Sequence, residues 1–420
     1  MIKEFGLVSG GRKGDHQSFL SNFSGCFSKK PFQTANKITD RLLQMGWDYG
    51  IDGYRLNDML RRKVGNCLGL SCLYGSILVE NGFSPEYELV VGPKGYQRET
   101  EIDLLECLLR GDYFSFDQPV MPEKAEDFQH LEFATLMHPR LKFDGDIFET
   151  TTLNYQEPSV IEGESVRLLS EDQLLALVLF ERGYQERIAL RPDFARAKKL
   201  LFGSLEKDPQ NRMAWAELAK IAWDSFDDRL FFQARNGFLS AEDNDSQYFL
   251  EKNWLLGNSE DLDRALSFNP TNMMAWFQKH VVLEEDLRTQ RVNCAVAAQC
   301  IARSGVLDLG DFYSVNAHVL ASLFPNDALN LVAGSLSKKT RRFDYYLALA
   351  MLGLPEMLDD LSPSSPIELA RLAFAQKILR KESNAWMFVS GRFSESKIFQ
   401  SVASLLEQQW IQVRIRCSFR

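Results

Sequence analysis

Apolar residues recur at helical spacing in the segment that precedes residue 80. The pattern i, i+3, i+4, i+7, i+8, which places apolar side chains on one face of a helix, is met by Leu70, Leu73, Tyr74, Ile77 and Leu78. Asn66 is a natural N-cap residue, and Asn81 followed by Gly82 is a common helix stop. The pattern therefore predicts an amphipathic helix over 67–81, with Cys67 in its first turn and on the buried edge of the apolar face.

The first part of the chain mixes helical and strand patterns. A helix is expected over 35–43 and a short apolar strand over 87–92, while apolar and polar residues alternate around 131–152. Between residues 91 and 129 the chain is irregular, mostly acidic and rich in proline, which is typical of a surface insertion or a lid-like loop. We predict an α+β domain over residues 1–165.

The second part of the chain reads as helical. From about Val166 onward strand patterns nearly disappear, and Ala, Leu and Phe recur at helical spacing up to Gln408. Segments 208–215 and 269–276 match each other and each places a proline near the first turn of a helix, but they are 61 residues apart. Pro192 precedes Pro209 by 17 residues, half of the roughly 34-residue period of helical hairpins. We predict an all-α, solenoid-like domain of helical repeats over residues 166–420.

The composition fits a soluble globular protein, with 45% apolar and 25% charged residues. The formal net charge of −9 argues against a general nucleic-acid binder, because such proteins carry an excess of Lys and Arg. The first residues contain no apolar stretch of signal-peptide length, and the longest apolar run, Leu174 to Phe180, is too short to span a membrane. We therefore expect a cytoplasmic protein that binds neither nucleic acid nor membrane.

Seven cysteines are scattered along the chain, at positions 26, 67, 72, 107, 294, 300 and 417. They form no CxxC pair and no Cys/His spacing of the zinc-finger type, so the sequence indicates no disulfide framework, no metal site and no cofactor. Cys67 is the candidate nucleophile, because the backbone N–H groups of a helix start favour a thiolate over a thiol. Cys72, deeper in the same helix, is expected to be an inert core thiol.

A thiolate nucleophile normally works with a histidine, and a third group orients that histidine. Five histidines are present. His16 lies near a loose N-terminus, and His280 and His318 lie in the helical half. His130 and His138 are therefore the candidates.

The segment that begins at His138 is typical of a β-hairpin, because an Asp-Gly pair at 144–145 separates two alternating runs. With a two-residue turn, Arg140 faces Glu149 directly, and His138 and Glu149 become diagonal neighbours on one face, about 7–8 Å apart between backbones. Glu149 could then orient His138, or it could form a simple cross-strand ion pair with Arg140, and a one-residue slip of the turn would move it to the other face. Pro139 restricts this strand to an edge position or a strand start.

A second pairing would join His130 with Asp144 or Asp146. It keeps a His–Asp pair but places the acid at the turn of the hairpin rather than on its return strand. We rank this pairing after that of His138 with Glu149.

A helix-start cysteine in the motif GNCLGLS at 65–71, followed by a strand and a His-led hairpin with an acidic residue at its far end, resembles the transglutaminase-like superfamily of papain-type fold. The resemblance includes the bacterial branch fused to tetratricopeptide-type repeats, and it covers about residues 61–153. It implies that Cys67 is the nucleophile, His138 the base and Glu149 the third member. Two positions depart from the family pattern, because the third residue is usually Asp and the residue two after the histidine, here Arg140, is commonly aromatic.

The helices over 190–279 resemble degenerate tetratricopeptide repeats. Aromatic residues at helical spacing in such repeats usually pack between helices, which is the expectation for Trp215, Trp223, Trp254 and Trp276. Stacked helical hairpins also form extended concave surfaces, so this half would recruit a protein or peptide partner.

The resemblance implies a thiol-dependent acyl-transfer enzyme, a cysteine hydrolase or acyltransferase acting on protein or peptide amide bonds. Proteolysis, deamidation and cross-linking are equally compatible with the sequence. The alternative is a transglutaminase-like fold without activity that serves as a protein–protein interaction scaffold, and a third hypothesis treats the repeats as a chaperone-like or assembly scaffold. The substrate, the partner, the number of repeats and the oligomeric state stay open at this point.

Overall fold

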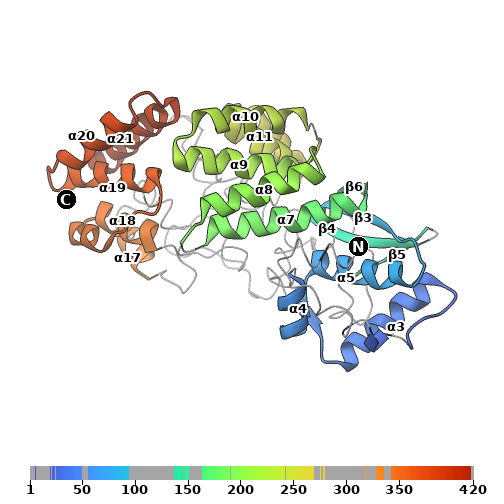
Figure 1. Cartoon of the computed structure of the whole chain (residues 1–420). Helices are drawn as coiled ribbons and strands as arrows, with labels where there is room; N and C mark the ends of the chain where they lie inside the picture. The colour runs from blue at the N-terminus through green and yellow to red at the C-terminus, as the bar shows by residue number, and fades with distance from the viewer. Residues whose placement is uncertain are drawn as a thin grey trace, which may run out of the picture.

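The computed structural model describes residues 25–49, 55–93, 137–143, 145–150, 163–189, 191–241, 243–268, 328–334 and 342–417, with a few short pieces between them. This part of the chain is mostly helical, with one four-stranded sheet and one two-stranded sheet near the N-terminal end. Figure 1 shows the sheet and the first helices at one end of the molecule and the later helices extending away from them. The observed architecture fits a mixed α+β part followed by a helical part.

Helix α5 (Cys67–Glu80) lies at the centre of the α+β part, with α3 (Pro31–Gln44) and α4 (Leu56–Arg62) against it. The helices expected over 67–81 and 35–43 are therefore confirmed. The amphipathic character of α5 is wrong, because every residue from Leu68 to Leu78 is buried. The side without large apolar residues carries glycine, serine and cysteine, and these small side chains let the sheet pack there.

Gly75 shows how close this packing is. A Cβ atom built on it would lie 2.3 Å from the hydroxyl oxygen of Tyr87, a buried residue of strand β3 (Glu86–Pro93). Gly75→Ala is therefore expected to destabilise the fold by about 1–3 kcal/mol, although alanine favours a helix. The matched control is Gly391→Ala in helix α20 (Asn384–Arg392), where a Cβ meets nothing within 4 Å, and this variant should be neutral or slightly stabilising. Urea unfolding of both variants measures the difference, and equal free energies would contradict the close helix–sheet contact.

The four-stranded sheet has the order β5-β4-β3-β6, and each neighbouring pair is antiparallel. Its strands are β3 (Glu86–Pro93), β4 (Met137–Phe143), β5 (Asp146–Phe148) and β6 (Gly163–Leu169). The expected strand over 87–92 and the hairpin around 144–145 are present as β3 and β4–β5. The short strands β1 (Asp48–Tyr49) and β2 (Val64–Gly65) form a separate parallel pair just before α5. Most of the insertion expected between residues 91 and 129 lies outside the described residues.

Strand β6 runs across the domain boundary that the sequence predicts at residues 165 and 166. It continues to Leu169 and pairs with β3 along most of its length, so the sheet extends past the boundary and the first helix after it begins at Glu171. The sequence failed here because β6 exposes apolar side chains. Val166 is 50% exposed and Leu168 65% exposed, whereas the alternating residue Arg167 forms ion pairs, so the strand lacks the usual apolar-in, polar-out pattern.

The helical part begins with a run of antiparallel helices that stack in chain order (Figure 1). Their bounds are α7 (Glu171–Ile188), α8 (Phe194–Lys207), α9 (Arg212–Ser225), α10 (Asp228–Ser240), α11 (Ser246–Leu256) and α12 (Glu260–Phe268). Four of them start at an Asp or Asn cap whose side chain accepts a backbone N–H three residues on. The caps Asp193 and Asp227 are 34 residues apart, and so are the caps Asn211 and Asp245. Helices α8 to α11 therefore repeat with this period, and the neighbouring helices that pack most closely are the pairs α7–α8, α9–α10 and α11–α12.

Aromatic residues pack between these helices, as expected for three of the four tryptophans. The rings of Trp223 on α9 and Trp254 on α11 meet edge to face with centroids 6.0 Å apart, and Phe231 on α10 contacts both. Trp215 lies so close to Gly237 that a Cβ there would come within 2.4 Å of its ring. Trp276 and the segment 269–274 lie outside the described residues. Pro192 and Pro209 precede the caps Asp193 and Asn211 rather than lying inside the helices.

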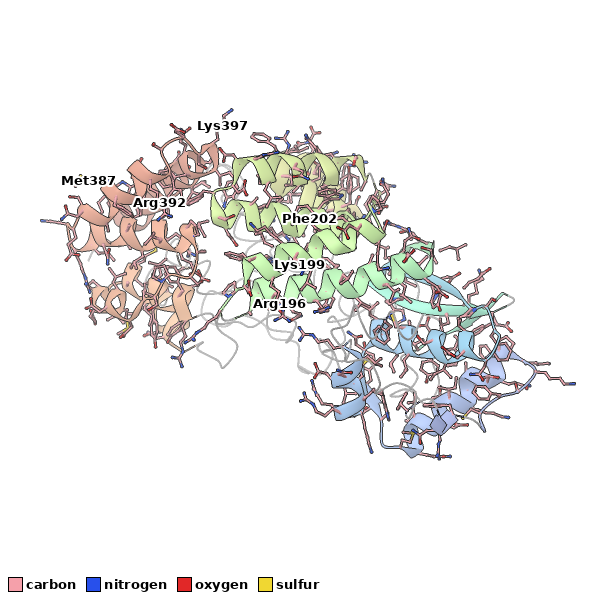
Figure 2. All side chains as sticks on the ribbon, viewed as in Figure 1. Arg196, Lys199, Phe202, Met387, Arg392 and Lys397 are labelled. Carbon is pink, nitrogen blue, oxygen red and sulfur yellow. The ribbon has the colours of Figure 1, made fainter. Side chains whose placement is uncertain are left out.

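The C-terminal helices return to the middle of the helical part. Their bounds are α17 (Ala328–Ala333), α18 (Arg342–Met351), α19 (Pro366–Leu379), α20 (Asn384–Arg392) and α21 (Lys397–Cys417). Asp228, in the first turn of α10, accepts the backbone N–H groups of Lys397 and Ile398 at 2.8 and 3.2 Å, so it caps the start of α21. Figure 2 shows side chains projecting from α8, with Arg196 and Lys199 labelled, and from the C-terminal helices, with Met387 labelled and 59% exposed.

Among the helices that the structure describes, none is long and apolar enough to cross a bilayer.

Candidate active site

Cys67 is the first residue of α5, and Asn66 caps that helix. Asn66 has an extended backbone (φ −92°, ψ 175°), and its side-chain oxygen accepts the backbone N–H of Gly69 at 2.8 Å. The thiol of Cys67 is partly exposed, whereas Cys26 and Cys72 are buried. The cap thus fixes the start of the helix and leaves Cys67 accessible at its N-terminal end.

The hairpin β4–β5 has the register that a two-residue turn dictates. Leu141 pairs with Phe148 and Phe143 pairs with Asp146, and Gly145 in the turn has a φ of 97°, a value that favours glycine. Pairing of β4 with β5 begins only at Leu141. Pro139, two residues earlier on β4, therefore has a neighbouring strand only on the β3 side. This position explains how proline is tolerated within β4, because its missing N–H would have faced the open side.

His138 and Glu149 are brought together by this register. The Nε2 atom of His138 lies 2.6 Å from Oε2 of Glu149, and both side chains are only 3% exposed. Cys67 is the other side chain that acts on the imidazole, and its hydrogen bonding and charge raise the pKa of His138. Because Nε2 is taken by Glu149, Nδ1 is the nitrogen left for the thiol. The three residues that the sequence singled out therefore meet in one place, arranged as Cys67, His138 and Glu149 in series.

The environment of His138 favours its charged form. Burial lowers the pKa of His138, but the hydrogen bonds and negative charges of Cys67 and Glu149 outweigh burial and raise this pKa to about 9. The imidazole is therefore protonated at neutral pH. A cationic imidazole beside a cysteine sulfur is the arrangement in which a cysteine is held as a thiolate.

Glu149 also meets the competing partner that the sequence suggested. Its second oxygen, Oε1, accepts a hydrogen bond from Nη1 of Arg140 at 3.1 Å, while Oε2 faces His138. The sequence allows Glu149 either to orient His138 or to form an ion pair with Arg140, and the structure contains both contacts. One carboxylate serves the two cations because each uses a different oxygen.

Residues that the sequence did not single out join the hairpin to α5. The hydroxyl of Ser71 donates to the carbonyl oxygen of Pro139 at 2.9 Å and lies 3.1 Å from the hydroxyl of Thr150. Thr150 in turn donates to the carbonyl oxygen of Cys67 at 3.3 Å. These contacts hold His138 beside Cys67. The serine in the helix motif and the threonine after Glu149 are visible in the sequence, but their meeting depends on how α5 crosses the sheet.

The remaining thiols have other environments. Burial raises the pKa of Cys72 strongly, and it also raises the pKa of Cys26, so the expectation of an inert core thiol at Cys72 is confirmed. Cys107, Cys294 and Cys300 lie outside the described residues.

The second pairing, of His130 with Asp144 or Asp146, cannot be placed as a unit, because His130 and Asp144 lie outside the described residues. Asp146 is exposed on the first position of β5. Within the described part of the chain, no group of three or more His, Cys, Asp or Glu residues is arranged to hold a metal ion.

Comparison of the chain with protein-family models, with curated proteins and with solved structures finds no match. The resemblance to the transglutaminase-like superfamily and to tetratricopeptide repeats therefore stays a prediction from the sequence motifs. The functional argument rests on the geometry of Cys67, His138 and Glu149.

Proposed function

We propose that the chain is a thiol-dependent acyl-transfer enzyme acting on carboxamide or peptide bonds, with Cys67 as nucleophile, His138 as proton carrier and Glu149 as the group that orients His138. The observation that carries the proposal is that His138 binds the buried carboxylate of Glu149 through Nε2 and interacts with the partly exposed thiol of Cys67, which raises the pKa of the imidazole. This series has the order that activated cysteine nucleophiles require.

The reaction follows from the charges. The Cys67 thiolate attacks the amide carbonyl carbon, and the carbonyl electrons move to oxygen to give an oxyanion. Backbone N–H groups at the start of a helix have no intrahelical partner, and those of Cys67 and Leu68 are suited to hold this oxyanion, since Asn66 already binds that of Gly69. The C–N bond then breaks as His138 gives its proton to the leaving nitrogen, and a thioester remains on Cys67.

The thioester is resolved in a second half-reaction. Neutral His138 removes a proton from water or from an amine, which attacks the thioester carbonyl and releases Cys67 as a thiolate beside a protonated imidazole. Water as the acceptor gives hydrolysis of a peptide bond or deamidation of a carboxamide, and an amine gives cross-linking. Glu149 keeps Nδ1 directed at the sulfur throughout, because it binds Nε2.

The helical part would recruit the substrate protein or another protein partner. The starts of its helices α8 to α11 repeat every 34 residues, which is the repeat length of tetratricopeptide units. The scaffold without activity is the less favoured alternative, because binding of a partner does not require a buried His138–Glu149 pair beside an accessible cysteine.

Trapping of the thioester tests the proposed function. The chain is incubated with a library of glutamine-containing peptides and a fluorescent primary amine, then quenched in acid and analysed by intact-protein and peptide mass spectrometry. We expect an acyl adduct on Cys67 that hydroxylamine removes, and no adduct in Cys67→Ser. Cys72→Ala is the matched control and should retain the adduct.

The products distinguish the three outcomes of the same chemistry. Release of ammonia without amine incorporation indicates deamidation, incorporation of the amine indicates cross-linking, and new peptide N-termini indicate proteolysis. Absence of any Cys67 adduct or product across peptides and intact proteins would contradict the proposal and favour the scaffold.

A further inference from the structure

A row of alternating charges continues from the His138–Glu149 pair across one face of the sheet. Arg140 binds Glu149 through Nη1 at 3.1 Å, and its Nε and Nη2 atoms both lie 2.9 Å from Oε2 of Glu88 on the neighbouring strand β3. The other oxygen of Glu88 accepts a hydrogen bond from Nζ of Lys142 at 3.0 Å. From the active site outward the charges are those of His138, Glu149, Arg140, Glu88 and Lys142, with alternating sign.

The strand register places these side chains together. Glu88 lies directly opposite Arg140 in the β3–β4 ladder, and His138, Arg140 and Lys142 alternate along β4, so all of them share one face. Arg140 is 4% exposed and Glu88 5% exposed, while Lys142 at the outer end is about 30% exposed. Desolvating an arginine and two carboxylates is costly, so replacement of any inner member leaves a buried charge without its partner.

We propose that Arg140 and Glu88 are positioning residues of the Cys67–His138 pair: Arg140 fixes the carboxylate that orients His138, and the opposed charges of Arg140 and Glu88 set how much negative charge Cys67 can hold. This inference rests on the proposed function of Cys67. Arg140 binds one oxygen of Glu149 and so turns the other toward Nε2 of His138. Glu88 binds the Nε and Nη2 atoms of the same guanidinium and so keeps the guanidinium in contact with Glu149.

The sign of each substitution follows from charge alone. Arg140→Met makes the cluster one unit more negative, which favours uptake of a proton. A cysteine thiolate has an ordinary pKa of about 8.5 and a glutamate about 4.3, so the thiolate is protonated first. Glu88→Gln makes the cluster one unit more positive and favours the thiolate. The double variant Arg140→Met with Glu88→Gln removes one positive and one negative charge, so the net charge of the cluster returns to that of the wild type.

The groups around the row are consistent with this sign. Burial raises the pKa of Glu88, but the hydrogen bonds and charges of Lys142 and Arg140 hold this pKa below the usual range, so Glu88 is charged at neutral pH. On the same strands Glu86 and Asp146 are exposed, and Arg167 pairs with Asp245 instead. From α5, which packs on β4, the titratable groups of the described chain are Cys67 itself, the buried thiol of Cys72, the phenol of Tyr74 and the exposed end residue Glu80.

The test measures the rate of Cys67 alkylation by iodoacetamide at pH 6 and pH 9.5 in the full chain. Peptide mass spectrometry identifies the alkylated site, and circular dichroism confirms that each variant is folded. We expect Arg140→Met to lower the rate at pH 6 by about tenfold or more with little change at pH 9.5. Glu88→Gln should keep or raise the rate at pH 6, and the double variant should recover most of the wild-type rate. Lys142→Met, at the exposed end, should have the smallest effect.

Recovery in the double variant separates charge from structure. If Arg140 only supported the fold, a second buried replacement would impair Cys67 further, and equal or lower rates in the double variant would overturn the inference. A wild-type rate in Arg140→Met at pH 6 would also overturn it. Should Arg140→Met fail to fold, Glu88→Gln decides, since a fall in its rate at pH 6 contradicts the predicted sign. A wild-type Cys67 that reacts at pH 6 no faster than cysteines of the unfolded chain would instead refute the proposed function itself.

Discussion

Replacing His138 with alanine is expected to lower the rate of Cys67 alkylation at pH 6 by about a hundredfold or more. In the native chain the pKa of His138 is about 9, so the imidazole carries a positive charge beside the sulfur at this pH. An ordinary cysteine, with a pKa of about 8.5, is only about 0.3% thiolate at pH 6, which is the level that remains once the cation is removed. A thiolate stabilised by a cation is a somewhat weaker nucleophile, so the measured loss is smaller than the change in thiolate fraction.

The pH dependence of this loss identifies its cause. His138 loses its proton as pH rises through about 9, and a thiol without a cation also ionises in that range, so the rates of wild type and His138→Ala should converge by about pH 9.5. Glu149→Gln keeps a hydrogen-bond acceptor but removes the charge that helps to raise the pKa of His138, so its profile should lie between the two.

Rates of iodoacetamide labelling at pH 6, 7.5 and 9.5, resolved by peptide mass spectrometry, provide the measurement. Cys72→Ala is the control and should match the wild type at each pH, because the Cys72 thiol is buried. Equal labelling of Cys67 in wild type and His138→Ala at pH 6 would show that the imidazole does not activate the cysteine.

The local features of this site follow from the sequence because they depend on short-range rules. An Asn cap fixes Cys67 at the start of α5, and an Asp-Gly turn fixes the register of β4–β5, which sets the positions of His138 and Glu149 relative to each other. The helix caps of the second half follow the same rules, and their 34-residue spacing agrees with the period suggested by two prolines.

The features that the sequence did not yield depend on contacts between distant segments. Glu88 is a single acidic residue in an apolar strand, and nothing near it indicates that Arg140, 52 residues later, will lie opposite. Strand β6 is not predicted because apolar and polar residues alternate there only over the short run from Ser165 to Leu168, and the apolar residues Val166 and Leu168 are exposed. Helix α5 was read as amphipathic because burial against a sheet requires small residues, and glycine and serine carry no hydrophobic signal.

The ion pairs that join β6 to the helices also form between residues that are far apart in the sequence. Asp245 is fully buried and caps α11 by accepting the N–H of Tyr248 at 2.9 Å. Its other oxygen lies 2.5 Å from Nη2 of Arg212 on α9 and 3.4 Å from Nη2 of Arg167 on β6. Both arginines also pair with Asp243. This cluster joins strand β6 to the start of α9 and the start of α11.

Arg212→Met is therefore expected to lower the free energy of unfolding by about 3–5 kcal/mol, because it leaves the carboxylate of Asp245 buried with only the more distant Arg167 as a cation. Arg380→Met is the matched control. Its guanidinium makes two hydrogen bonds to Asp359, at 2.6 and 2.9 Å, but that carboxylate is 69% exposed, so its loss should cost less than about 1 kcal/mol.

Urea unfolding followed by circular dichroism and tryptophan fluorescence measures both changes, since Trp215 and Trp223 lie on α9 together with Arg212, and Trp254 lies on α11. Each variant removes two contacts of a guanidinium with carboxylate oxygens. In Arg212→Met these belong to Asp243 and the buried Asp245, and in Arg380→Met both belong to the exposed Asp359. Similar losses in the two variants would mean that Asp245 finds water or another cation once Arg212 is gone, and that the sheet and the helices are held together by apolar packing instead of by this cluster.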